Sequence, residues 1–320
     1  MGFRNFPRMG RGFTVLCLAA CVFAVPAARS QTADQSQNRV DITPGQPTFT
    51  SGPTALGVDA QGCAVASPND DDLGEQQILK RQEEYLPFSV SVATSVFYTS
   101  NVALTRNGEK DDVLFSPGIT LIYQPRLTGT LYAEIGVAQQ WFVYDRFSEL
   151  DFASFDAIVG LAYYLPQFHN LSLRARYDYN RLTDTDFHEF FADHAIVLSA
   201  TMPFRINRAQ QIAFGTDIEL SLGGQPDAPR RNDYSFYVGY SVNVCRSFSI
   251  DTSARLAVRD YHRGSRTDVS EILGISANYR VREWLIVSFL SSFAWNQSNQ
   301  DVFDYSDANV GGGAAVTIRF

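Results

Sequence analysis

The stretch LSLRARYDYN, residues 171–180, carries the clearest structural signal in the chain. Every second residue is apolar, and each residue between them is polar or charged. Successive side chains of a β-strand point to opposite faces, whereas a helix repeats every 3.6 residues. The stretch therefore predicts a strand with one apolar face and one polar face.

The same alternation recurs from residue 87 to residue 320, in twelve runs joined by connections of two kinds. Tight turns are expected near residues 125–126, 166–169, 203–208, 245–247 and 280–283. Longer, charged loops are expected at residues 100–112, 145–151, 182–190, 223–232, 260–268 and 297–307. Short turns at one end and longer loops at the other are typical of a transmembrane antiparallel up-and-down β-barrel, here of about 12 strands.

A soluble β-sandwich is the alternative, because it also alternates apolar and polar residues. Two features favour the membrane. The runs span roughly 10–14 residues, longer than the usual soluble strand and long enough to cross a bilayer at a tilt. Aromatic residues also gather near both ends of the runs, as an interfacial girdle requires.

The composition excludes several classes of protein. Hydrophobic residues make up 45% of the 320 residues and aromatic residues 13%, which is too apolar for a disordered chain. The formal net charge of −8 argues against a nucleic-acid binder, which needs a basic surface. The only long apolar run lies near residues 13–28, so a bundle of membrane helices is excluded as well.

The N-terminus has the layout of a secretory signal peptide over residues 1–28. Three arginines precede an apolar core, and small residues at Val25-Pro26-Ala27 suit cleavage. An alternative is a lipoprotein signal, in which Cys21 would carry the lipid. Residues 29–86 lack a sustained period and predict a flexible periplasmic tether, with a short helix at 73–84 and a plug or a partner-docking helix as alternatives.

The chain ends in Gly-Ala-Ala-Val-Thr-Ile-Arg-Phe, residues 313–320, an alternating run that finishes on the aromatic Phe320. This ending resembles the terminal-strand signature of bacterial outer-membrane barrels. The whole region 87–320 resembles the β-barrel porin families, including the Tyr98-Thr99-Ser100-Asn101 run before the first loop. The resemblance implies a location in the outer membrane, contact with its lipid, and assembly by the barrel-assembly machinery. It does not imply a cargo, although some members accompany exopolysaccharide export.

If the apolar face meets lipid, the polar face lines the lumen. The inward acids are then Glu134, Asp156, Asp178, Asp193, Asp217, Glu219 and Asp251. The inward bases are Arg174, Arg176, Arg255, Arg259, Arg280 and Arg319. Twelve strands lie between the filled interior of eight and the open channel of sixteen, which predicts a narrow lumen. With the near balance of charge, we expect a narrow, weakly selective diffusion channel for small solutes, and cross-lumen ion pairs are the structural alternative.

Two other functions stay open. One is a scaffold or export component, with residues 31–86 binding a periplasmic partner. The other is a lipid-modifying enzyme, which needs a histidine beside a serine. His194 has lipid-facing parity, but no suitable serine accompanies it, so we predict no enzyme. No spacing of Cys or His predicts a metal or another cofactor.

Two cysteines remain beyond the signal peptide. Cys63 lies in the tether, and Cys245 lies in a predicted periplasmic turn. A disulfide between them would pin the tether beneath the barrel, and the alternative is two free thiols.

Overall fold

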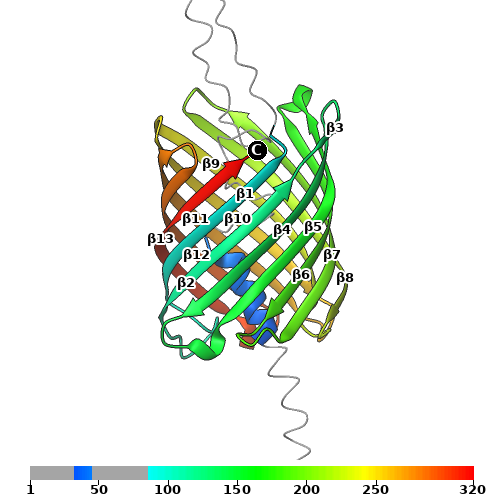
Figure 1. The fold of residues 1–320 in the computed structure, drawn as a ribbon. Coiled ribbons are helices and arrows are strands. Elements are labelled where there is room, and N and C mark those ends of the chain that lie inside the picture. Colours follow the sequence, from blue (N-terminus) through cyan, green and yellow to red (C-terminus); the bar gives the residue numbers. More distant parts are fainter. Residues whose placement is uncertain (1–31, 45–85) are drawn as a thin grey trace, which may run out of the picture.

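The computed structural model describes residues 32–44 and 86–320, in which a closed antiparallel barrel dominates (Figure 1). Twelve long strands follow one another around it, and the first pairs with the last. They are β1 (Phe88–Thr99), β2 (Asp112–Tyr123), β4 (Leu131–Tyr144), β5 (Phe152–Leu165), β6 (Leu171–Thr183), β7 (Glu189–Arg205), β8 (Gln210–Gln225), β9 (Arg231–Cys245), β10 (Phe248–Tyr261), β11 (Thr267–Arg282), β12 (Leu285–Ser298) and β13 (Tyr305–Arg319). The short β3 (Arg126–Thr128) pairs with β4. Three one-turn 3-10 helices, η3 (Ser148–Leu150), η4 (Pro166–Phe168) and η5 (Asp301–Phe303), lie in connections. The predicted twelve-stranded barrel is confirmed.

The barrel is apolar outside and polar inside, the reverse of a soluble protein. Outward residues such as Val96, Leu161 and Phe236 are exposed by 48%, 46% and 52%. Inward serine, asparagine, aspartate and arginine side chains are buried along the same strands. An apolar exterior of this kind is stable only against lipid, so the alternation places the barrel in a membrane.

The seam between β1 and β13 is closed by backbone and by aromatic contacts. Phe88 and Phe320 exchange two backbone hydrogen bonds, of 3.1 and 3.0 Å. Their rings stack with centroids 5.9 Å apart, and Phe88 also stacks on Tyr123 at 4.2 Å. Phe320 therefore stabilises the pairing of the first and last strands at the end of the barrel where the short turns lie.

Several loops are shorter than predicted, because the strands continue past the residues whose outward side chains are apolar. The connections predicted at 182–190, 223–232 and 260–268 shrink to 184–188, 226–230 and 262–266. Residues 100–111 form the longest connection among the described residues and turn inward, with Val102 and Leu104 each only 5% exposed.

Residues 32–42, predicted to be part of a flexible periplasmic tether, form a helix inside the barrel near the loop end (Figure 1). We call it the lumenal helix. The tether prediction is wrong for these residues, because buried polar partners on the barrel wall stabilise a helix too short to be stable alone. No helix in the described part of the chain is long and apolar enough to cross a membrane. The predicted signal peptide (1–28), the lipidation of Cys21, the helix at 73–84 and Cys63 lie outside the described residues.

Candidate functional site: a lumen closed by a helix

The lumenal helix rests on two apolar clusters at the loop end of the barrel. Ala33, fully buried, packs into a cluster of inward residues formed by Val102, Leu114, Phe142, Tyr144, Phe152, Leu182 and Phe191. Ile42, 1% exposed, packs with Leu104, Ala294 and Tyr305. The apolar contacts of the helix come from Ala33, Val40 and Ile42, and its other buried residues make polar contacts.

One side of the helix faces a row of three arginines on neighbouring strands. Arg231 begins β9, Arg259 lies on β10, and Arg266 directly precedes β11. Strand pairing sets Arg259 opposite Asp233 of β9 and Asp268 of β11. Arg231 and Arg266 each stand two residues before one of these aspartates, so the three arginines lie side by side. We call Arg231, Arg259 and Arg266 the arginine row.

The helix offers the arginine row three acceptors, Asp34, Asn38 and Asp41, whose spacing places them on one helical face. Arg266 donates to Asp34 at 2.9 Å. Arg231 and Arg259 both donate to Asn38, at 2.7 and 2.8 Å, and both donate to Asp41 at 2.8 Å. Tyr261 adds a hydrogen bond of 2.7 Å from its hydroxyl to Asp34.

A second side of the helix carries Arg39, whose guanidinium is 1% exposed and contacts the β1–β13 seam. It pairs with Asp307 at 2.7 Å and donates to Thr99 at 3.0 Å. It also donates to the backbone carbonyl of Asn101 at 2.7 Å. Arg39 thus links the first and last strands of the barrel to the helix.

Two charged groups of the helix have shifted pKa values. Burial acts to lower the pKa of Arg39, yet Tyr144 and Asp307 leave it above its ordinary value. Burial acts to raise the pKa of Asp41, yet Arg259 and Arg231 hold it below its ordinary value. Both groups are therefore charged at neutral pH, and the helix is attached through ion pairs.

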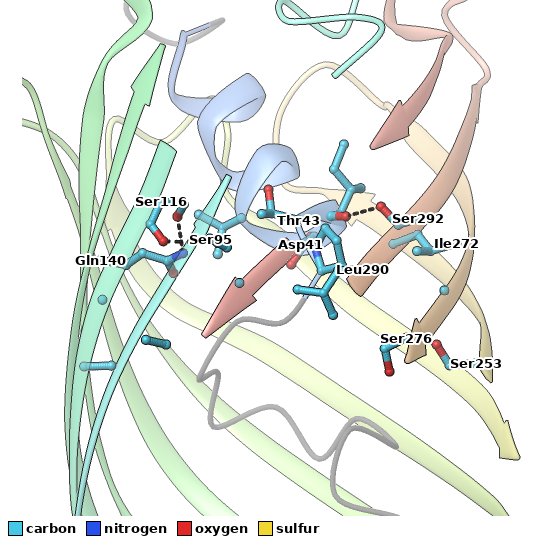
Figure 2. Close-up of a pocket in the computed structure, with 18 of the residues that line it drawn as sticks. Asp41, Thr43, Ser95, Ser116, Gln140, Ser253, Ile272, Ser276, Leu290 and Ser292 are labelled. Atoms are coloured by element: carbon cyan, nitrogen blue, oxygen red, sulfur yellow. Dashed lines mark hydrogen bonds between the residues drawn. The ribbon is translucent and has the colours of Figure 1, made fainter. Parts of the chain in front are cut away.

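Beneath the helix lies a cavity of about 660 Å³, with Gln37, Val40, Asp41, Thr43 and Pro44 on its helical side. Figure 2 shows Asp41 and Thr43 of the helix together with Leu290 and Ser292 of β12, where Ser292 donates to the carbonyl of Ile42 at 2.8 Å. The wall formed by β1, β2, β12 and β13 is rich in small residues such as Ser95, Ser116, Ser288, Ser291, Gly313 and Ala315.

The opposite wall is acidic. Asp156 on β5, Asp178 on β6, Asp193 on β7, and Asp217 and Glu219 on β8 all line the cavity. Across the whole lining, eight carboxylates face three arginines, Arg231, Arg255 and Arg280. The lining of the cavity therefore holds more acidic than basic residues, whereas the sequence predicted a near balance.

The inward residues predicted from the sequence fall in several places. Eight of them line the cavity, namely Asp156, Asp178, Asp193, Asp217, Glu219, Asp251, Arg255 and Arg280. Glu134 and Arg174 form an ion pair of 3.4 Å, and Arg176 is buried. Arg259 belongs to the arginine row, and Arg319 is exposed at the turn end of β13.

Of the arginines in the row, sequence reasoning identified Arg259 as inward but missed Arg231 and Arg266, because it placed their segments in loops. Arg231 and Asp233 stand at i and i+2, as do Arg266 and Asp268. Extending the alternation of β9 and β11 outward by a few residues would have assigned these side chains to the lumen. Nothing in the alternation marked the helix itself.

The remaining candidate sites are simple to place. Cys245 is an exposed free thiol at the turn between β9 and β10, and its pairing with Cys63 stays a prediction. His194 points outward and its Nδ1 lies 2.5 Å from the Tyr177 hydroxyl. Among the described residues, no group of three or more histidines, cysteines or acids is arranged to hold a metal ion.

Solved structures of other proteins resemble this chain in fold. No family model and no curated protein matches the sequence. Among solved structures, the barrel is similar to an outer membrane channel from Pseudomonas putida F1, with a TM-score of 0.50, 11% identity, and coverage of 73% of this chain and 96% of that one. It is also similar to the NanC porin (TM-score 0.42, 8% identity, 70% and 98% covered) and to outer membrane phospholipase A from Escherichia coli (0.45, 12%, 71% and 92%). At 11% identity, the similarity to the Pseudomonas channel shows the fold alone, that of a bacterial outer-membrane barrel, and the apolar exterior agrees with that membrane.

Proposed function

We propose that the protein is a narrow porin-like channel for small solutes, and that the lumenal helix holds it closed at the loop end. The observation that carries this proposal is the cavity of about 660 Å³ directly beneath a helix fixed by buried ion pairs. A polar space of that size inside a membrane barrel accommodates hydrated ions and small polar molecules.

The attachment of the helix suits a closure that can be released. A plug held by a large apolar surface would respond little to pH, whereas one held by ion pairs depends on both partners being charged. Because the helix belongs to the same chain as the wall, its release needs no exchange of subunits.

The test is planar-bilayer conductance of the full-length barrel, compared with the double variant Asp34→Asn/Asp41→Asn. The variant weakens the contacts of the helix with the arginine row and leaves the strands unchanged, so it should open more often than the natural protein. The matched control, Asp145→Asn/Asp186→Asn, removes two exposed loop carboxylates and should behave like the natural protein.

A further comparison deletes residues 32–44. Ohmic current steps from this deleted barrel are expected if the cavity continues to both mouths. A silent deleted barrel that still folds, as judged by its heat-modified migration in gels, would contradict the channel function and favour a scaffold or export role.

A further inference from the structure

The direction of the lumenal helix in the barrel sets which end of it meets the outside of the cell. Its first residues contact the rim at the loop end. Gln35 donates to the carbonyl of Ala103 at 2.7 Å, in the connection after β1. Asp34 accepts from Arg266 at 2.9 Å, in the connection between β10 and β11.

The last residues of the helix lie deeper in the lumen. The carbonyl of Ile42 accepts from Ser292, which stands on β12 six residues before that strand ends at Ser298. At about 3.3 Å per residue, Ser292 lies roughly 20 Å along the strand from the rim. Thr43 and Pro44 line the cavity. The helix therefore runs inward from the rim, with its N-terminal end outermost.

The rim at the loop end is the extracellular one. Barrels of the outer membrane have short periplasmic turns and longer extracellular loops. Here the two-residue turns 246–247 and 283–284 lie at the same end as Phe88 and Phe320, where the barrel chain begins and ends. The 100–111 connection lies at the opposite end, beside the start of the helix.

We propose that Thr32, and with it the N-terminal end of the lumenal helix, is accessible from the cell surface. Thr32 is exposed, whereas its neighbours Ala33 and Asp34 are buried. Leu86, directly before β1, lies at the opposite, turn end of the barrel. A molecule outside the cell can then act on the plug without entering the channel. This inference is independent of whether the lumen conducts.

Thiol labelling of intact cells with a bulky, membrane-impermeant maleimide tests the proposal. The test protein carries Thr32→Cys with Cys63→Ser and Cys245→Ser, while Cys17 and Cys21 fall in the predicted signal peptide. Labelling in intact cells is expected at more than half the level reached after the outer membrane is permeabilised.

Two controls define the two sides of the membrane. Phe187→Cys in the same background marks the surface, because Phe187 lies in the 184–188 loop and is 75% exposed. A protein that keeps only Cys245 marks the periplasm and should be labelled only after permeabilisation. If the Thr32→Cys protein follows Cys245, or is labelled only after denaturation, the proposal is overturned.

Discussion

Replacing Arg39 by methionine tests the central ion pair of the plug. The side chains of Arg39 and Asp307 are 1% and 0% exposed, and their atoms lie 2.7 Å apart. Methionine keeps much of the apolar stem but leaves the buried carboxylate without its counter-charge. Removing one partner of a buried pair costs about 3–5 kcal/mol.

The surroundings of Asp307 indicate that removing Arg39 costs an energy at the lower end of that range. Asp307 keeps hydrogen bonds from Thr99 at 2.8 Å, from the backbone N–H of Asn101 at 3.0 Å and from Asn309 at 2.8 Å. A cost of about 3 kcal/mol corresponds to a roughly 100-fold shift of the equilibrium between docked and released helix. The shift is expected to favour the released state.

Two assays measure this shift. Single-channel recording gives the ratio of open to closed time, which should rise about 100-fold if release opens the lumen. Hydrogen exchange of the amides in residues 32–42 reports release directly and should accelerate by a similar factor.

The control is Arg106→Met, which removes an ion pair to Asp301 whose side chains are 48% and 83% exposed. Exposed pairs contribute about 0–1 kcal/mol, so this variant should leave both readouts nearly unchanged. If Arg39→Met matches Arg106→Met in both assays, the buried pair does not hold the helix and the reasoning is refuted.

Three further predictions concern pH, ion preference and packing. The docked helix lowers the pKa of Asp41, so this ion pair stabilises docking fully above the ordinary pKa of about 4. The stabilisation is lost as the pH falls through the lowered value, so channel opening should rise below about pH 4. An opening that stays unchanged down to pH 2.5 would contradict this. In the barrel lacking residues 32–44, the reversal potential in a KCl gradient should show a preference for K⁺ over Cl⁻, which Asp217→Asn should reduce. A preference for Cl⁻ would show that the acidic wall does not set selectivity. A Cβ on Gly215 would lie 2.0 Å from Cζ of Tyr237, so Gly215→Ala should lower the free energy of unfolding of the barrel by about 1–3 kcal/mol in a urea titration. The control, Gly223→Ala, should leave it unchanged, because no atom lies within 4 Å of a Cβ there.

The barrel itself could be predicted from the sequence because alternation is a local property. Run after run repeats the pattern of residues 171–180, and the membrane demands the same exterior at each, so the strand count and topology follow. The ends of the strands were harder to predict, since outside the bilayer nothing requires the outward residue to be apolar. That is why Arg231 and Arg266 were assigned to loops.

The lumenal helix could not be predicted, for a different reason. Its sequence has no apolar face of the usual width, because only a few of its residues pack on apolar clusters and the others meet arginines and other polar groups of the wall. Asp34, Asn38, Arg39 and Asp41 resemble a solvated linker until the wall that binds them is known. The partners, at positions 231, 259, 266 and 307, are distant in sequence, and only the closed barrel brings them together.

The position of Arg39 across the seam has a consequence for how the protein is assembled. Its guanidinium binds Thr99 at the end of β1 and Asp307 at the start of β13, the first and last strands, which pair with each other only when the sheet closes into a barrel. Before closure, this half of the binding site does not exist. The helix can therefore make its full set of ion pairs only in a completed barrel, so its docking and the closure of the β1–β13 seam stabilise each other.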